Sequence, residues 1–476
     1  MFRLSVVAPA LVAALCGVLA AGYASHWQMY LGYDQFFYVD SVRAILRGDL
    51  EGVHMVWAPG YPMAGAVLSL FGLWPAQALV LVSLLAFGGT LVLLNHALSV
   101  LLPRMLLRTV VLAAMALLPA QHMLLATPLS EHLFGFLVIG LMYALHDHRS
   151  GRDILPAAVV MAIPVVRYAG VPLLLALLPA AVSAAGRRES LGRTLRIAGV
   201  ALLSLCGLIL WNILVTGHLS GSPRFDFNLD ILHHVSDVGW AVIGLVSRQG
   251  LDTDRSFTST TIGFTMVLVT VGISLCGLRS DRHPHVRDAS LLVLLYLGGV
   301  VVMRSIAFFM PLSHPRFIIP ILPLLVLVIV SESTRLITPR HGNLAILILS
   351  ISILILSTVQ TMRARMHADP MLPVREAEGV LDKVATSGDT VIVNHAGKSI
   401  YRHSAATVRF TGDSSEVAAM LPAADFVVIA AEHVRDGRYE IRTNRAQMMK
   451  DVVERSREFN LLHASSLSLV YRHRTR

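Results

Sequence analysis

Charged side chains that could do acid–base or anion-binding chemistry stand at the borders of long apolar runs in this chain. Asp34 and Asp40 follow the first run, Glu131 stands where a connecting segment enters another run, and Arg316 stands beside a late one. A carboxylate can act as a general base, and a lone carboxylate at an apolar border is costly unless it is paired or functional. Arginine offers five donors that suit phosphate oxygens. These residues are therefore the first candidates for a site.

The apolar runs beside these residues predict a polytopic α-helical membrane protein. Hydrophobic residues make up 55% of the 476 residues and charged residues only 14%, against about a quarter in an ordinary soluble domain. Because a membrane-spanning helix needs roughly 20 apolar residues, we expect about eleven transmembrane helices. The expected helices cover residues 4–22, 77–101, 109–127, 131–146, 154–166, 168–185, 197–216, 261–278, 289–306, 317–333 and 343–361.

The arginines between the apolar runs predict the orientation of the chain. With a cytoplasmic N-terminus, retained as an anchor rather than cleaved as a signal peptide, every short basic loop falls on the cytoplasmic side. These loops carry Arg104 and Arg108; Arg149 and Arg152; Arg187, Arg188, Arg193 and Arg196; Arg279, Arg282 and Arg287; Arg335 and Arg340. Loop arginines account for the net charge of +9, so we expect no nucleic-acid partner. Two long connections, about 23–76 and 217–260, and the C-terminal tail then lie outside.

The first outer connection has the pattern of helices that lie in the membrane interface. Its apolar and polar side chains separate onto two helical faces: Tyr38, Val42, Ile45 and Leu46 on one, Asp40, Arg43 and Arg47 on the other. Pro59-Gly60-Tyr61-Pro62 then favours a fixed turn before a second short helix over residues 63–74.

From about residue 363 onward the composition changes to that of a small α/β domain. Short β-prone runs cover residues 390–393, 426–430 and 466–471, and helical patterns cover residues 373–386 and 442–458. Alternating helices and strands over roughly 110 residues imply one such domain on the outer membrane face. The chain is therefore expected to divide into a transmembrane catalytic domain, residues 1–362, and an extracytoplasmic (periplasmic) α/β domain, residues 363–476.

Motifs in four places resemble the GT-C glycosyltransferases, which are membrane enzymes that use polyprenyl-phosphate sugars. The first outer connection of this chain resembles the family's first outer loop in Asp34, Tyr38, Arg43-Ala44-x-Leu46-x-Gly48 and Pro59-Gly60-Tyr61-Pro62. A later segment resembles the family's second outer loop, namely Pro128-Leu129-Ser130-Glu131-His132-Leu133-Phe134. Two further matches are Val165-Val166-Arg167-Tyr168-Ala169-Gly170 and His314-Pro315-Arg316-Phe317-Ile318-Ile319-Pro320. Their order and topology resemble bacterial members that transfer mannose, aminoarabinose or galacturonic acid.

The resemblance implies a GT-C-like fold and an inverting glycosyltransferase in the inner membrane. It implies transfer of a monosaccharide from a polyprenyl-phosphate donor to a cell-envelope glycan, lipid or protein acceptor, with membrane lipids as further partners. The acceptor hydroxyl needs a base, and the departing phosphate needs cations. By its position in the motif, Asp34 is the candidate base and Asp40 the second candidate. The alternative interpretations are a helix cap for Asp34 and a solvated helix face for Asp40.

Seven residues are candidates for substrate binding: Glu131, Arg167, Arg316, Arg43 and Tyr61, which lie in the resembling motifs, and His54 and Trp57, which could shape a sugar pocket in the first outer connection. Glu131 could instead balance a helix dipole, Arg167 favours an ion pair with Glu131 over direct phosphate contact, and Arg316 could reach lipid headgroups. The aromatic residues are also common as interfacial anchors. The sequence contains no complete metal-ligand set that we can assign, and a divalent metal ion stays open as a cofactor because family members differ.

Two other classes of protein remain as alternatives. A transporter or flippase would be expected to place ionisable residues or broken helices near the bilayer midplane, and often to have repeated halves. An O-antigen ligase or polysaccharide polymerase would be expected to depend on arginine and histidine in a large outer loop. Neither pattern is clear, whereas the first outer connection carries Asp34.

Overall fold

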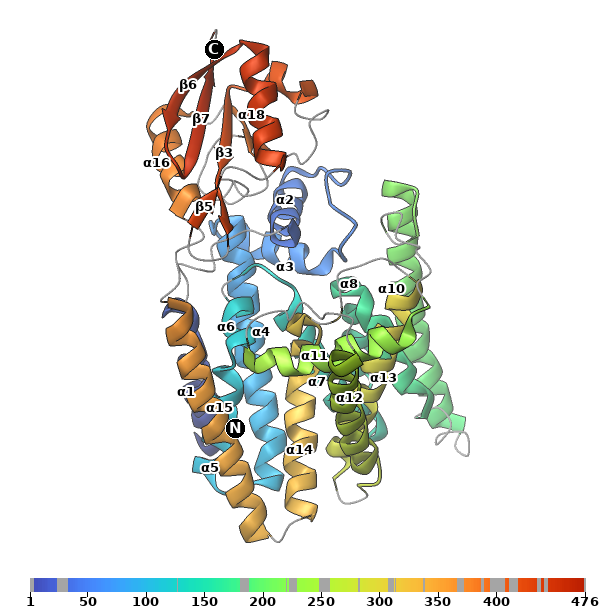
Figure 1. Cartoon of the computed structure of the whole chain (residues 1–476). Coiled ribbons are helices and arrows are strands. Elements are labelled where there is room, and N and C mark those ends of the chain that lie inside the picture. Colours follow the sequence, from blue (N-terminus) through green and yellow to red (C-terminus); the bar gives the residue numbers. More distant parts are fainter. Residues whose placement is uncertain are drawn as a thin grey trace. The chain divides into compact units, whose positions relative to one another are not determined.

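A computed structural model gives the fold of the chain (Figure 1). It describes residues 4–23, 33–125, 127–179, 188–219, 221, 229–247, 257–280, 283–306, 312, 314–336, 339–365, 372–386, 389–393, 407–410, 418–434, 438–440 and 444–474. The chain divides into two compact units: residues 1–22 with 37–361, and residues 23–36 with 362–476. Each unit is described by itself.

Helices make up the first unit, and three of them, α1, α2 and α15, extend into the second unit with residues 23, 33–36 and 362–365. In chain order they are α1 (Leu4–Tyr23), α2 (Tyr33–Arg47), α3 (Gly60–Ser69), α4 (Pro75–Leu101), α5 (Met105–Ala116), α6 (Pro119–Leu125), α7 (Glu131–Arg149), α8 (Ile154–Val166), η2 (Tyr168–Ala176), α10 (Arg188–Thr216), α11 (Ile231–Ser247), α12 (Phe257–Leu278), α13 (Pro284–Ile306), η3 (Pro315–Phe317), η4 (Ile319–Ile321), α14 (Leu322–Leu336) and α15 (Pro339–Arg365). The elements labelled η are 3₁₀ helices.

Apolar helices long enough to cross a membrane are abundant in the described part of the chain. Six qualify by length and composition: Pro75–Leu101, Leu191–Thr216, Thr258–Leu278, Pro284–Ile306, Pro315–Leu336 and His341–Val359. Shorter apolar helices include Val7–Leu19, Met105–Ala116, Ile154–Val166, Tyr168–Pro179 and Ile231–Val246. A polytopic membrane protein, as the sequence predicts, is therefore confirmed.

The structure departs from the predicted helices in three places. The expected helix over residues 109–127 is two helices, α5 and α6, because Pro119 lacks the amide that would continue the first. The expected helix over 168–185 begins as the 3₁₀ helix η2, which contains Pro172. The second long connection, 217–260, contains the unpredicted helix α11. Its polar residues, among them His233, His234 and Asp237, interrupt the apolar run that would have identified it.

Helix α7 lies at the centre of the first unit, in contact with α4, α8, α13 and α14. Glu131, the first residue of α7, is buried, and so are Phe134 and Val138 about one and two turns further along. The start of α7 is where the motifs of the sequence meet.

The second unit contains a five-stranded sheet with strand order β2-β1-β3-β7-β6. Its strands are β1 (Thr390–Val393), β2 (Thr407–Phe410), β3 (Phe426–Ala430), β6 (Phe459–Ala464) and β7 (Ser468–His473). β1 pairs parallel with β2 and β3, whereas β7 pairs antiparallel with β3 and β6. β4 (Glu432–Val434) and β5 (Arg438–Glu440) form a separate antiparallel pair.

Two helices cover the sheet on opposite sides, α16 (Leu372–Val384) and α18 (Asn444–Ser456), as Figure 1 shows. Met449 and Val453 of α18 pack with Val427, Ile429 and Tyr471 in one apolar core. α16 is held by Glu376, whose carboxylate accepts hydrogen bonds from His463 Nε2 (3.0 Å) and Ser465 Oγ (2.8 Å). The predicted small α/β domain is confirmed, with strands β2, β4, β5 and β6 added to those that the sequence indicates.

Candidate functional site

An ion pair between Glu131 and Arg167 forms the centre of the candidate site. Arg167 Nη1 lies 2.9 Å from Glu131 Oε1, and the two side chains are 13% and 1% exposed. Arg167 stands between the end of α8 and the start of η2, so its extended backbone turns the side chain toward the start of α7. The ion pair that the sequence favours for Arg167 is therefore present, and it joins two of the motifs.

Arg316 brings a third motif to the same carboxylate. Its Nε lies 3.6 Å from Glu131 Oε1, and its side chain is 14% exposed. The turn that carries Arg316 is fixed locally, because its amide donates a hydrogen bond to His314 Nδ1 at 3.2 Å. The next turn packs closely on α7, where a Cβ added at Gly135 would lie 3.3 Å from the backbone of Pro320. Two guanidinium groups thus share one buried carboxylate.

Oε2 of Glu131 is buried and has no hydrogen-bond partner among the described residues. A buried carboxylate oxygen without a donor is costly, which makes it a natural contact for a hydroxyl group of a ligand.

Ser130 connects this cluster to the first outer connection. Its hydroxyl accepts a hydrogen bond from Arg167 Nη1 at 3.2 Å and lies 3.1 Å from the Tyr38 hydroxyl. Tyr38 belongs to α2 and is 5% exposed. Tyr38, from the apolar face that the sequence assigns to α2, therefore contacts the start of α7, whereas Leu46 of the same face is 40% exposed.

The Pro59-Gly60-Tyr61-Pro62 motif packs against the same elements. A Cβ at Gly60 would lie 2.7 Å from the carbonyl oxygen of Val165, so only glycine permits this approach of α3 to the end of α8. Tyr61 is fully buried, and its hydroxyl donates to the Leu79 carbonyl at 2.8 Å and lies 2.9 Å from Ser83 Oγ. This environment favours a packing role for Tyr61 over direct sugar contact.

Asp40, His54 and Trp57 lie together on the surface of the first connection. His54 Nε2 is 2.7 Å from Asp40 Oδ2, with exposed side-chain fractions of 32% and 29%. Phe37 stacks on Trp57 at a centroid distance of 5.1 Å and meets His54 edge-on at 4.4 Å. A paired, half-exposed carboxylate that is flanked by aromatic rings could receive a sugar hydroxyl.

Asp34 and Arg43 complete the predicted residues. Asp34 lies in the first turn of α2 and is half-buried, and it falls in the unit that contains the α/β domain. Arg43 places its guanidinium 5.1 Å from the centroid of the Trp74 ring, a cation–π contact at the edge of α2. Within the described residues, no three His, Cys, Asp or Glu side chains gather closely enough to hold a metal ion.

Tyr296 is a site residue that the sequence does not single out. It lies in α13, is fully buried, and its hydroxyl has no hydrogen-bond partner among the described residues. Its ring is 6.0 Å from that of Phe134, and its hydroxyl interacts electrostatically with Arg167, Glu131 and Arg316. A lone polar side chain inside a predicted membrane span was the available signal, since such groups are costly there.

The bundle of apolar helices, the two short helices of the first connection and the small C-terminal sheet form a polytopic membrane fold, as predicted, and solved structures share it. The crystal structure of ArnT from Cupriavidus metallidurans in the apo state is similar, with a TM-score of 0.58, 12% sequence identity, and 97% of each chain covered. The structure of that protein bound to undecaprenyl phosphate gives a TM-score of 0.57 at 12% identity, again over 97% of each chain. No protein-family model and no curated protein matches the sequence.

Proposed function

We propose that this protein is an inverting GT-C glycosyltransferase that takes a monosaccharide from a polyprenyl-phosphate donor. The observation that carries the proposal is the meeting of Arg167 and Arg316 on Glu131 beneath the first-connection helices. The planar guanidinium groups of Arg167 and Arg316 suit the oxygens of a phosphate group, and hydrogen bonds between charged groups of this kind are strong. One similar structure is that of a protein bound to undecaprenyl phosphate, which supports a lipid-linked phosphate as donor.

The reaction assigns separate tasks to the two groups of residues. Asp34, or else Asp40, takes the proton from the acceptor hydroxyl as its oxygen attacks the anomeric carbon. The bond from that carbon to the phosphate oxygen breaks on the opposite face, so the configuration inverts. Arg167 and Arg316 stabilise the negative charge that develops on the departing polyprenyl phosphate. Glu131 holds both guanidinium groups in place.

The proposal also covers the acceptor, the orientation in the membrane and the division into domains. The acceptor is a glycan, lipid or protein of the cell envelope, and the site faces the outer side of the inner membrane, with the N-terminus cytoplasmic. Residues 1–362 then form the catalytic domain, and residues 363–476 form an extracytoplasmic domain. A donor that has already crossed the membrane explains how such a site works without a nucleotide sugar.

The experiment is radiolabel transfer from a panel of polyprenyl-phosphate sugars to membrane extracts, with wild-type protein and the Asp34→Asn variant. We expect transfer from at least one donor by the wild type and a loss of about 10²–10⁴-fold in Asp34→Asn, the usual contribution of a general base. Glu51→Gln is the matched control, because Glu51 is an exposed carboxylate in the same connection.

The other outcomes distinguish between the two candidate bases and between an enzyme and a transporter. Full activity in Asp34→Asn with loss in Asp40→Asn moves the base to Asp40. Full activity in both variants contradicts a carboxylate base in this connection. No transfer by the wild type from any donor, together with solute uptake by reconstituted vesicles, would replace the enzyme with a transporter.

A further inference from the structure

Two buried polar atoms of the candidate site lack hydrogen-bond partners. One is Oε2 of Glu131, at the start of α7, and the other is the hydroxyl oxygen of Tyr296, in α13; neither has a partner among the residues that the structure describes. Glu131 is 1% exposed and Tyr296 is fully buried. Native proteins contain few buried polar atoms of this kind, because each is costly. Two of them in one cluster therefore require a physical explanation.

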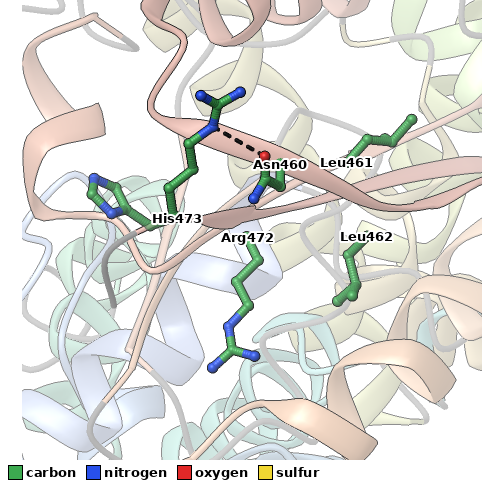
Figure 2. Close-up of a pocket in the computed structure, with 6 residues that line it drawn as sticks. Asn460, Leu461, Leu462, Arg472 and His473 are labelled. Atoms are coloured by element: carbon green, nitrogen blue, oxygen red, sulfur yellow. Dashed lines mark hydrogen bonds between the residues drawn. The ribbon is translucent and has the colours of Figure 1, made fainter.

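The second unit contains a cavity in which the polar groups are arranged differently. It is lined by residues of β6 and β7 and by Arg474, whose Nε donates a hydrogen bond to Asn460 Oδ1 at 3.0 Å (Figure 2). The side chain of Arg472 runs in the opposite direction from the strand pair, so the charges of this cavity do not converge on one ligand. In the first unit, by contrast, the charges converge and two polar atoms among them lack partners.

The two atoms are complementary and belong to one cluster. A carboxylate oxygen only accepts hydrogen bonds, whereas a tyrosine hydroxyl can donate one. The hydroxyl of Tyr296 interacts electrostatically with Glu131 and with both guanidinium groups beside it. Phe134, about one turn after Glu131, packs between them: its ring lies 6.0 Å from the Tyr296 ring and 6.0 Å from the guanidinium carbon of Arg167.

The guanidinium groups leave the carboxylate of Glu131 with few hydrogen bonds. Arg167 Nη1 lies 2.9 Å from Oε1 and also donates to Ser130 Oγ at 3.2 Å. Arg316 Nε lies 3.6 Å from the same carboxylate oxygen, which is too far for a hydrogen bond. A carboxylate has about four acceptor sites, and those on Oε2 stay unused among the described residues.

A phosphate at the proposed donor site would change this balance. It brings negative charge to the same two guanidinium groups, so the hydrogen bonds that they give to the phosphate weaken their interaction with Glu131. A buried carboxylate that loses its cations is strongly destabilising unless another donor compensates. The hydroxyl of Tyr296 is a nearby donor that makes no hydrogen bond with the described residues.

We propose that Tyr296 is a positioning residue whose hydroxyl donates a hydrogen bond to Oε2 of Glu131 when the donor phosphate binds the two guanidinium groups. This inference rests on the proposed function. In the free protein the two atoms are not bonded, and occupation of the site joins them. The new bond stabilises the carboxylate beside the phosphate, so Tyr296 favours binding of the lipid-linked phosphate without touching it.

The test is binding of polyprenyl phosphate to the purified full-length protein, measured by calorimetry for wild type and Tyr296→Phe. This probe carries no sugar, so no sugar hydroxyl can take the place of Tyr296. We expect the Kd to rise roughly 10- to 100-fold in Tyr296→Phe, the range for one hydrogen bond to a charged group. Without the probe, the unfolding temperature of Tyr296→Phe should equal or exceed that of wild type, because the change removes an unsatisfied buried hydroxyl.

Tyr143→Phe is the matched control. Tyr143 lies in the same helix as Glu131, and its hydroxyl donates to the Leu93 carbonyl at 2.9 Å. The control should therefore lower the unfolding temperature and leave the Kd unchanged. A second comparison uses the Glu131→Gln background, in which Tyr296→Phe should change the Kd by less than about twofold, since the hydroxyl acts through the carboxylate.

Three results would overturn the inference and leave the proposed function standing. The first is an equal Kd in wild type and Tyr296→Phe. The second is a lower unfolding temperature of free Tyr296→Phe, which would mean that the hydroxyl is already bonded. The third is an equal effect of Tyr296→Phe in the Glu131→Gln background, which would place the hydroxyl on the phosphate itself.

Infrared difference spectra provide a further readout if Glu131→Gln does not fold. Binding of the probe should shift a carboxylate band in wild type, and Tyr296→Phe should lack this shift; the same shift in both proteins would overturn the inference. Failure of the wild type to bind polyprenyl phosphate at all would overturn the proposed function and this inference with it.

Discussion

Glu131 and Arg167 form a 2.9 Å ion pair between the first residue of α7 and the residue that follows α8. The pair is largely buried, and Arg316, from a third element, approaches the same carboxylate oxygen. A carboxylate in this position does more than balance the dipole of α7, because it fixes the positions of two cations that lie 149 residues apart in sequence (316 − 167). Glu131 is therefore a positioning residue for the proposed phosphate contact.

Replacing Glu131 tests this pairing. Glu131→Gln leaves two buried guanidinium groups without their carboxylate, so we expect a loss of about 3 kcal/mol in stability, as when one partner of a buried ion pair is removed. The measurement is thermal unfolding of the purified full-length protein. The double variant Glu131→Gln/Arg167→Met should lose less free energy of unfolding than the sum of the losses in the two single variants. Additive losses would argue against direct coupling of the two side chains.

Arg316 can be examined through its geometry as well as its charge. Arg316→Gln should raise the KM for the lipid-linked donor by roughly 10- to 100-fold, the range for a lost hydrogen bond between charged groups. Arg316→Lys keeps the charge and loses the planar fork, so its KM should fall between those of wild type and Arg316→Gln. Arg335→Gln serves as the control, since Arg335 is 47% exposed and pairs with Glu332. Equal KM values for Arg316→Gln and Arg335→Gln would remove Arg316 from the site.

Gly60 connects the first motif to the backbone that carries Arg167. The methyl group of Gly60→Ala would press on the Val165 carbonyl, two residues before Arg167. We expect a loss of about 1–3 kcal/mol, typical of overpacking, together with reduced transfer. Gly88→Ala is the matched control, because no neighbouring atom lies within 4 Å of the added Cβ. Unchanged unfolding temperature in Gly60→Ala would contradict the close contact of α3 with α8.

The α/β domain should lose stability at high pH through Tyr471. Burial, and after it the Glu454 carboxylate that accepts its hydrogen bond at 3.1 Å, raise the pKa of the Tyr471 hydroxyl well above its ordinary value. Because the folded state then holds its proton more tightly, this contribution is complete below about pH 10 and is lost progressively above it. Calorimetry of the full-length protein from about pH 9 to pH 11 should therefore show a shallower decline for Tyr471→Phe. A decline as steep as that of wild type would exclude Tyr471 as its source.

The sequence alone was sufficient for the features that depend on local pattern. Apolar length predicts most of the helices, since a membrane-spanning helix must satisfy its own backbone hydrogen bonds. β1 and β3 begin and end where their β-prone runs do, because β3 is buried and apolar throughout and β1 is so after Thr390. Helix α11 was not predicted, because its polar residues interrupt the apolar run by which a membrane helix is recognised. Glu131, Arg167 and Arg316 could be named because a charge beside an apolar run is conspicuous.

Only the tertiary structure decided which of these charges meet. The contact of Arg167 and Arg316 with one carboxylate depends on how α7, α8 and η3 pack, and sequence spacing carries no information about such a contact. The same is true of Tyr296, which the packing of α13 on α7 brings to the cluster, and of Tyr61, which α3 buries against α4. Local pattern fixes where a helix forms, whereas the long-range fit of side chains fixes which helix ends share a site.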